Sequence, residues 1–376
     1  MTFLFWFSFL LIFYAYAGYP VLLFLTSLFF KKSVRKKAGE PTVSLILSAF
    51  NEENAIEWKL LNLLELDYPS EKLEILVGSD GASDRTDEII SRFRSSRVRF
   101  FRFVKNLGKP HVLNALAREA TGSILLFTDA RQALNPQAVR ALVANFDDPT
   151  VGCVSGELYF RSRESRVNGS VGRGMGVYWA YEKWLRKRES EIGSMLGATG
   201  ALYAIRKNLF PRLPEEILVD DMYIPLSIVE KKYRAVFESG AKAYDRVSEH
   251  AHEEFRRKVR TLAGNYQIFS RFSGLFHPGR SPIAWQLFSH KWLRLIVPFF
   301  LTGLFVSNLF LIVDGPCYGA FFLAQLLFYV MAFLGRELKG IGALPHTFCL
   351  LNYSAAVALF KFLTEDQRVT WEKAYA

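Results

Sequence analysis

Three stretches between residues 43 and 130 decide the fold. Residues 43–53 read VSLILSAFNEE, residues 73–81 read LEILVGSDG and residues 123–130 read SILLFTDA. Each contains an apolar run of strand length, followed at or near its end by Asn, Asp or Glu. Each therefore predicts a buried strand that carries polar side chains at its carboxyl end.

Segments with helical spacing of apolar residues separate these strands. The pattern predicts helices over residues 56–66, 84–93 and 109–120, and a further strand over 97–103. This alternation indicates an α/β fold with a mostly parallel sheet, in which a ligand lies at the carboxyl ends of the strands. Later elements are expected as helix 178–189, strand 202–205 and helix 219–231.

Both ends of the chain predict membrane spans, although charged residues make up 22% of the sequence. No charged side chain occurs from Met1 to Phe30, and three later stretches also contain no Asp, Glu, Lys or Arg. A helix needs about 20 apolar residues to cross a bilayer, so one span is expected before the central segment and three after it. The later stretches are Leu295–Val313, Gly315–Gly335 and Ile341–Phe360.

The first stretch has an alternative interpretation as a signal peptide, because Ala15-Tyr16-Ala17 resembles a cleavage site. However, no basic residue precedes the apolar run, and apolar sequence continues to Phe30. An uncleaved anchor is therefore favoured.

Basic residues gather in short clusters within a net charge of +11. The cluster Lys31–Lys37 holds five positive charges in seven residues directly after the first span. Such clusters remain on the cytoplasmic side and attract anionic lipids. No nucleic-acid-binding motif accompanies them, so nucleic acid is not expected as a partner. The sequence predicts an integral membrane protein, fitting a bacterial cytoplasmic membrane, with a cytoplasmic central domain.

The expected domain organisation follows from these patterns. It comprises an anchor (1–30), a central α/β domain (41–280), an interfacial helix (281–294), about three C-terminal transmembrane helices (295–363) and a tail (364–376). Trp285 and Trp292 support the interfacial helix, since Trp favours the membrane–water boundary.

Four motifs in the central segment resemble those of the family 2 glycosyltransferases with the GT-A fold. They are Ser48–Glu53, Ser79–Thr86, Asn106–Lys109 and Phe127–Ala130. Each motif alone is weak, since Asp-Gly is common in turns. They occur in the order and at the spacing of the family, and the resemblance extends over about residues 41–270.

The resemblance implies an inverting transfer of a sugar from a nucleoside diphosphate to an acceptor, with Asp221 as the general base and Asp220 beside it. Asp129 would bind Mg²⁺ or Mn²⁺ as the first carboxylate of the Asp-x-Asp motif. The nucleotide sugar would contact Phe50, Asn51, Glu52, Glu53, Asp80, Gly81, Lys109, Asp129 and Arg131, and the acceptor or diphosphate would contact Gly197, Thr199, Gly200, Arg257 and Arg260.

The sequence departs from the family pattern at two places. Arg131 replaces the second aspartate of Asp-x-Asp, which calls the metal into question, although an Arg fork suits phosphate geometry. The Gln-x-x-Arg-Trp motif of polymerising members is represented only by residues 257–261, RKVRT, where Arg260 retains the arginine. Transfer to a lipid-linked or other membrane-associated acceptor is therefore favoured over processive polysaccharide synthesis.

Structural roles are the alternative for several of these residues. Asp80 and Asp84 suit turn and helix capping, Asp220 suits an N-cap, and Glu52 and Glu53 suit a helix start. Lys109 also stands at a helix start, where a solvated lysine is ordinary. For the whole chain, the alternatives are a processive synthase and a non-catalytic membrane-bound relative; a transporter is disfavoured because the spans carry almost no ionisable residue.

Overall fold

The computed structural model describes residues 1–95, 97–161, 170–246, 251–335 and 342–364. The chain forms two compact units. Of the described residues, the sheet unit comprises 31–161 and 189–246, and the helical unit comprises 1–30, 170–188, 251–335 and 342–364. The sheet unit thus differs from the expected 41–280 domain, because residues 170–188 and those from 251 onward belong to the helical unit.

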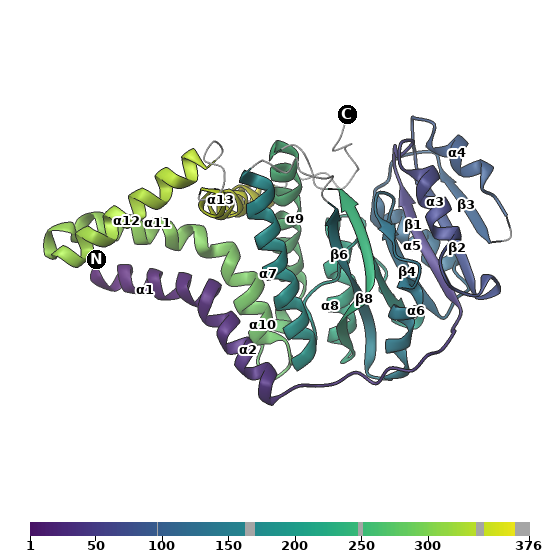
Figure 1. The fold of residues 1–376 in the computed structure, drawn as a ribbon, viewed down its shortest axis with the longest axis horizontal. Helices are drawn as coiled ribbons and strands as arrows, with labels where there is room; N and C mark the ends of the chain where they lie inside the picture. The colour runs from purple at the N-terminus through teal and green to yellow at the C-terminus, as the bar shows by residue number, and fades with distance from the viewer. Residues whose placement is uncertain (96, 162–169, 247–250, 336–341, 365–376) are drawn as a thin grey trace. The chain divides into compact units, whose positions relative to one another are not determined.

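The sheet unit is built on eight strands in the order β3-β2-β1-β4-β7-β6-β8-β5 (Figure 1). The pairs β1–β2, β1–β4, β2–β3 and β6–β8 are parallel, whereas β4–β7, β6–β7 and β5–β8 are antiparallel. This confirms the predicted α/β fold with a mostly parallel sheet. The strands are β1 (Val43–Ala49), β2 (Leu73–Asp80), β3 (Val98–Phe103), β4 (Ile124–Asp129), β5 (Ala133–Leu134), β6 (Val151–Arg161), β7 (Tyr203–Arg206) and β8 (Arg234–Arg246).

Helices pack on both faces of this sheet because successive strand residues point in opposite directions. Leu45 and Leu47 of β1 share a core with Leu60 and Leu63. On the other face, a Cβ on Gly78 of β2 would lie 2.4 Å from Val112 Cγ1, so β2 and α5 approach closely there. The helices of this unit are α3 (Ile56–Leu64), α4 (Thr86–Arg92), α5 (Lys109–Glu119), α6 (Ala138–Val143) and α8 (Asp220–Glu230), with short 3₁₀ turns at Ser70–Lys72, Ala144–Asp147 and Lys207–Leu209.

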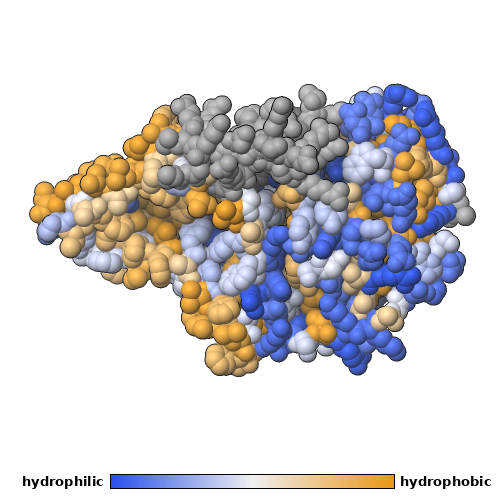
Figure 2. Space-filling view, viewed as in Figure 1, coloured by the Kyte–Doolittle hydropathy of each residue, from blue (hydrophilic) through white to orange (hydrophobic). Residues whose placement is uncertain are grey.

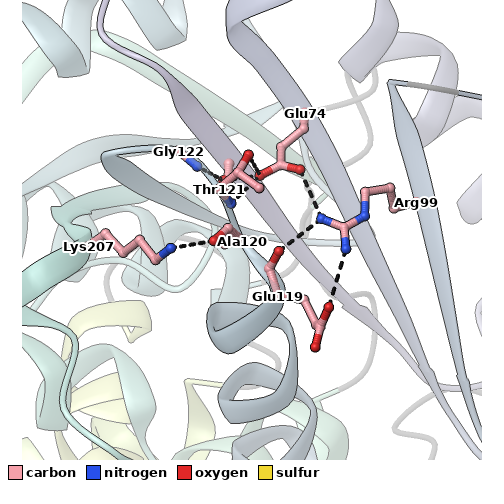
Figure 3. A network of polar contacts seen from close by, with 8 residues as sticks. Glu74, Arg99, Glu119, Ala120, Thr121, Gly122 and Lys207 are labelled. Carbon is pink, nitrogen blue, oxygen red and sulfur yellow. Dashed lines mark hydrogen bonds and ion pairs between the residues drawn. The ribbon is translucent and has the colours of Figure 1, made fainter.

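A polar network joins the amino-terminal ends of the strands (Figure 3). Glu74 of β2 accepts hydrogen bonds from the Thr121 N–H (2.6 Å), from the Thr121 hydroxyl and from Arg99. Arg99 also donates to the Glu119 carbonyl at the end of α5 (2.9 Å), and Lys207 donates to the Ala120 carbonyl. These bonds lie at the sheet edge opposite the polar strand ends, so they stabilise the fold rather than form the site.

The basic segment after the first span contacts the sheet unit in part through ion pairs. Arg35 Nε lies 2.9 Å from Asp147 Oδ2, and Lys36 Nζ lies 2.5 Å from Glu238 Oε2. Lys31 is more loosely paired with a carboxylate, at 3.9 Å. Three of the five basic side chains therefore have protein partners, so attraction to anionic lipids does not account for the whole cluster.

Four apolar helices in the helical unit are long enough to cross a membrane: Thr2–Phe29, Ala284–Asp314, Pro316–Leu334 and Ala343–Leu363. They coincide with the four predicted spans, and crossing of the membrane by each helix stays a prediction. Apolar side chains cover the surface over α1, α11 and α12 in Figure 2, and Phe3, Phe29 and Phe333 are among the most exposed. Exposed apolar surface of this extent fits a lipid environment, so the protein is associated with the membrane.

The helical unit contains these elements: α1 (Thr2–Phe13), a π-helical turn (Tyr14–Gly18), α2 (Tyr19–Phe29), most of α7 (Ser170–Ile192), α9 (Ala251–Arg271), a 3₁₀ turn (Ser273–Phe276), α10 (Ala284–Gln286), a π-helical turn (Leu287–Trp292), α11 (Leu293–Leu311), a 3₁₀ turn (Ile312–Asp314), α12 (Pro316–Leu334) and α13 (Ala343–Leu363). The expected separate interfacial helix at 281–294 is instead continuous with the second span. The expected tail lies outside the described residues from position 365 onward.

A buried ionic cluster joins α7 to the start of the second span. The carboxylate of Glu182 lies 2.6 Å from Arg294 Nη1, 3.3 Å from Lys291 Nζ and 3.1 Å from His290 Nε2. Burial alone would raise the pKa of Glu182, but Lys291, His290 and Arg294 hold it well below its usual range. The ionised carboxylate is therefore a structural link within the helical unit.

Candidate active site

The loops after β1 and β2 are hydrogen-bonded to each other, because these two strands are parallel neighbours. Asn51 has a left-handed φ of 53°, and its side-chain oxygen accepts the Ser83 N–H at 2.8 Å. The Glu52 N–H donates to Thr86 Oγ1 (2.8 Å), and the Glu53 N–H donates to Asp84 Oδ2 (3.2 Å). The predicted nucleotide-contacting residues of the first two motifs thus lie together at one sheet edge, next to the bend at Phe50.

Asp80 ends β2 and organises the third motif. Its two carboxylate oxygens accept the N–H groups of Leu107 (2.9 Å) and Gly108 (2.8 Å), and its side chain is fully buried. Burial raises the pKa of Asp80, against the lowering effect of the two N–H donors. This geometry gives Asp80 a role in positioning the Asn106–Lys109 segment, while direct contact with a nucleotide remains a prediction.

Gly81 makes the tight turn that brings these segments together. Its φ is +70°, and a Cβ built on it would lie 2.6 Å from the backbone nitrogen of Asn106. A side chain is therefore excluded both by conformation and by space. The role predicted for Gly81 at the nucleotide site is consistent with this close approach of two loops.

Lys109 joins two of the predicted acidic residues. Its Nζ lies 2.9 Å from Asp129 Oδ1 and 3.2 Å from Asp220 Oδ1. Burial alone would lower the pKa of Lys109, but Asp129 and Asp220 raise it well above its usual value. Lys109 is thus a fixed cation between the end of β4 and the start of α8, which the alternative of a solvated lysine does not describe.

Asp221 faces the glycine-rich segment before β7. Its Oδ2 accepts the Gly200 N–H at 3.2 Å, and its carbonyl accepts the Ala198 N–H at 2.8 Å. A Cβ on Gly200 would lie 3.4 Å from Asp221 Oδ2 and 3.5 Å from Asp129 Oδ2. The two carboxylates therefore both face Gly200, where a Cβ would make only ordinary van der Waals contacts with them, and Gly197 lies near the Asp221 carbonyl.

The acidic pair at the start of α8 does not provide the N-cap that the sequence offered as an alternative role for Asp220. The N-cap of α8 is Val219, and Asp220 is the first helical residue, so Asp220 is not the N-cap. Its carboxylate instead accepts a hydrogen bond from the Tyr203 hydroxyl at 3.4 Å, besides the contact with Lys109. Thr199, in the neighbouring segment, is fixed by an N–H bond to Ser155 Oγ at 3.0 Å.

The carboxylates fit a divalent cation only in part. Asp129 Oδ1 is bonded by Lys109, while Oδ2 faces Gly200. Among the residues that the structure describes, no group of three or more His, Cys, Asp or Glu side chains is arranged so that it could hold a metal ion by itself. This donor set suits a cation that takes most of its ligands from a diphosphate, as Mg²⁺ commonly does.

Arg131, the replacement for the second aspartate of the motif, is exposed at the end of β4. Its Nε lies 3.8 Å from Glu52 Oε1, so it connects the fourth motif with the first. Arg257 and Arg260 lie on α9 of the helical unit. Their predicted contact with acceptor or diphosphate remains a prediction.

Sequence reasoning missed Lys59, which lies behind the site. Lys59 is fully buried on α3, and its Nζ donates to Thr128 Oγ1 (2.8 Å) and to the Gln132 carbonyl (2.6 Å). The sequence does contain a signal for this residue: Lys59 is a charged side chain on the helical face of Ile56 and Leu63, which is otherwise apolar.

The comparisons with known proteins agree with this geometry. Residues 44–213 match the model of glycosyl transferase family 2. A probable glycosyltransferase, YdaM of Bacillus subtilis (strain 168), is 25% identical over 289 residues, covering 73% of this chain and 66% of that protein. A poly-beta-1,6-N-acetyl-D-glucosamine synthase of Staphylococcus aureus (strain MSSA476) is 25% identical over 235 residues, covering 61% of this chain and 56% of that protein.

Among solved structures, a mannosyltransferase from Pyrobaculum calidifontis, PcManGT, in complex with GDP-Man and Mn²⁺, matches with a TM-score of 0.75. It is 22% identical and covers 97% of this chain and 100% of its own. The fold is thus GT-A-like, and residues 44–213 are similar to glycosyl transferase family 2.

Proposed function

We propose that this chain is an inverting glycosyltransferase that moves a sugar from a nucleoside diphosphate to a membrane-associated acceptor. The observation that carries this proposal is the meeting of Asp129, Asp220 and Asp221 around Lys109 and Gly200 at the carboxyl end of the sheet. Ligands of open α/β sheets bind at that edge. The structural likeness to a mannosyltransferase solved with GDP-Man supports a nucleotide sugar as the donor.

The proposed reaction begins when Asp221 takes the proton from the acceptor hydroxyl. The acceptor oxygen forms a bond to the anomeric carbon of the donor sugar, and the bond from that carbon to the diphosphate oxygen breaks. The electron pair leaves with the nucleoside diphosphate, and the anomeric configuration is inverted. Lys109 and Arg131 supply positive charge near the departing diphosphate, with Arg131 suited to phosphate by its planar fork.

A divalent cation is the proposed cofactor, and Asp129 is the residue that would hold it. Bound there with the donor, Mg²⁺ or Mn²⁺ would offset the negative charge that develops on the diphosphate. The similar mannosyltransferase from Pyrobaculum calidifontis was solved with GDP-Man and Mn²⁺, which supports a cation beside the donor. Because Lys109 already neutralises part of the local charge, we expect the cation to accelerate transfer without being the only source of positive charge.

We also propose that the acceptor is lipid-linked or a saccharide held at the membrane, with the sheet unit on the cytoplasmic side. The four apolar helices support a membrane-associated acceptor, and the basic residues at 31–37 support the cytoplasmic orientation. A reporter attached at either end of the sheet unit would show on which side of the membrane that unit lies. Digestion by a protease added outside sealed vesicles would test the same orientation.

The first experiment measures nucleoside diphosphate release by the purified full chain in detergent. Donor sugars carrying UDP or GDP are supplied with membrane lipid extract, with and without Mn²⁺. The Asp221→Asn variant should lose at least 100-fold in kcat, because the amide cannot accept the acceptor proton. Asp67→Asn is the matched control: Asp67 is exposed, pairs with Arg140 and precedes β2 at the opposite sheet edge, so its activity should remain.

Two alternatives give different results in this experiment. Likeness to a poly-beta-1,6-N-acetyl-D-glucosamine synthase supports a processive synthase, which would release long polymer rather than a product one sugar larger. A non-catalytic relative would turn over no donor under any condition. Equal activity of Asp221→Asn and the wild type would remove Asp221 from the proposed mechanism.

A further inference from the structure

We propose that Lys59 is a positioning residue of the transferase site: it fixes the turn carrying Asp129 and Arg131 and connects that turn to the Gly197–Ala201 segment. This inference rests on the proposed function and goes beyond it, because Lys59 belongs to none of the motifs. Its side chain is fully buried within the sheet unit.

The two hydrogen bonds of Lys59 reach residues on both sides of Asp129 and Arg131. Thr128 precedes Asp129, and Gln132 follows Arg131, so Nζ bonds to both sides of the three-residue segment between them. The distances of 2.8 and 2.6 Å are those of well-formed hydrogen bonds. One buried amine therefore holds both ends of the turn whose exposed residues face the donor site.

The hydrogen bonds continue through Thr128. Its hydroxyl donates to the Ala201 carbonyl at 2.8 Å. Ala201 follows Gly200, whose N–H binds Asp221 Oδ2. The path from Lys59 thus reaches the segment on which the proposed general base rests, and it links both carboxylates to one group behind the sheet.

Neighbouring groups reinforce the same turn. The Gln132 side chain donates to Asp245 Oδ2 of β8 at 2.7 Å. Asn62, three residues after Lys59 on α3, exchanges two hydrogen bonds with the backbone of Leu134, at 2.8 and 3.1 Å. The α3 face therefore holds the whole β4–β5 connection through polar contacts.

Electrostatics explains why a lysine is tolerated at this position. An isolated buried ammonium would be costly, but Asp129 from β4 and Asp245 from β8 offset part of that cost. Burial lowers the pKa of Lys59 to about 7, against the raising effect of these two carboxylates. An apolar residue would pack at lower cost, so the lysine suits a positioning role better than a purely stabilising one.

The test compares the full-length wild type with Lys59→Met, which keeps the length of the side chain but donates no hydrogen bond. We expect kcat to fall at least tenfold and the Mn²⁺-dependent affinity for UDP or GDP to fall severalfold, with the protein still folded. Leu63→Ala on the same buried face of α3 is the control. It should unfold at a lower temperature while keeping kcat in the cold.

The pH profile separates positioning from packing. Loss of a proton from Lys59 near pH 7 leaves two N–H groups for its two hydrogen bonds but removes the positive charge that faces Asp129. In the wild type, kcat/KM should therefore change as the pH passes through about 7, and Lys59→Met should lack this step. Thr128→Val should reduce kcat as well, and adding it to Lys59→Met should cost little more, because both act through one path.

Three outcomes would overturn the inference. Lys59→Met could retain the kcat, nucleotide affinity and pH profile of the wild type, or it could lose activity only in proportion to its folded fraction, as Leu63→Ala would. Additive losses in the double variant would contradict the path through Thr128. If the wild-type protein binds nucleotide but turns over no donor, the proposed function fails, and the nucleotide affinities of the wild type and Lys59→Met still test the role of Lys59. If the wild type neither binds nucleotide nor turns over donor, both proposals fail.

Discussion

Two lysines near Asp129 show how strongly the immediate partners of a side chain set its charge. Lys109 contacts the carboxylates of Asp129 and Asp220 directly, and they raise its pKa despite burial. Lys59 donates hydrogen bonds to neutral oxygens, and the charges of Asp129 and Asp245 act on it from a greater distance. The effect of burial is therefore larger than theirs and lowers the pKa of Lys59 to about 7. Lys109 is therefore a permanent cation of the site, whereas Lys59 titrates near neutral pH.

The titration of Lys59 predicts a pH-dependent stability. A lysine in the unfolded chain has a pKa of about 10.4, so between about pH 7 and that value the unfolded chain binds more protons than the folded one. The destabilisation is complete below the folded pKa and is relieved as the pH rises. The wild type should therefore gain on the order of 2 kcal/mol relative to Lys59→Met between pH 7 and 9.

Thermal unfolding of both proteins in detergent across this pH range measures the effect. Leu63→Ala, which changes no titratable group, should keep a constant difference from the wild type. A constant difference for Lys59→Met as well would show that Lys59 has an ordinary pKa in the folded protein.

At the scale of elements, the site depends on short loops that follow parallel strands. The loops after β1 and β2 bond to each other through Asn51, Glu52 and Glu53. Asp80 at the end of β2 holds the segment before α5, which in turn places Lys109 against Asp129. A change in one turn should therefore alter the geometry of the whole edge.

Gly81→Ala tests this dependence. The left-handed φ of +70° costs an L-residue about 1–2 kcal/mol, and the new Cβ would lie 2.6 Å from Asn106 N. We expect at least that loss of unfolding free energy and a raised KM for the donor. Gly39→Ala is the control, since nothing lies within 4 Å of its Cβ; equal stability of both variants would contradict the argument.

At the scale of the whole molecule, the chain alternates between its two units. It begins in the helical unit and enters the sheet unit at Lys31, and the described residues from 170 and from 251 onward belong to the helical unit again until the chain re-enters the sheet unit at Glu189 after the first of these returns. The helical unit is held internally by the Glu182 cluster as well as by apolar contacts such as Phe5 with Leu304. A buried carboxylate with several cationic partners is costly to disrupt from one side.

Glu182→Gln should destabilise the helical unit by about 3–5 kcal/mol, because Lys291 and Arg294 would lose their buried counter-charge. Thermal unfolding in detergent measures the loss. Glu88→Gln is the control: Glu88 is exposed on α4, and its variant should unfold at nearly the wild-type temperature. A similar small effect for Glu182→Gln would show that the cluster contributes little.

The sequence by itself determined the elements with a local pattern. Apolar runs predicted β1, β2 and β4 and the four spans, and the polar residues at strand ends predicted the sheet edge that holds Asp80, Asp129 and Lys109. These features depend on periodicity and on chain order, which are visible in short windows. The α/β class follows from the same alternation.

Tertiary structure decided the rest. The long strands β6 and β8 pair with each other across more than 70 residues of chain, and that pairing has no local signature. Asp220 meets Lys109 and Tyr203 instead of capping α8, and Lys59 becomes buried behind Asp129. Such contacts join side chains far apart in sequence, and their burial, charge and partners arise only when the sheet has closed around them.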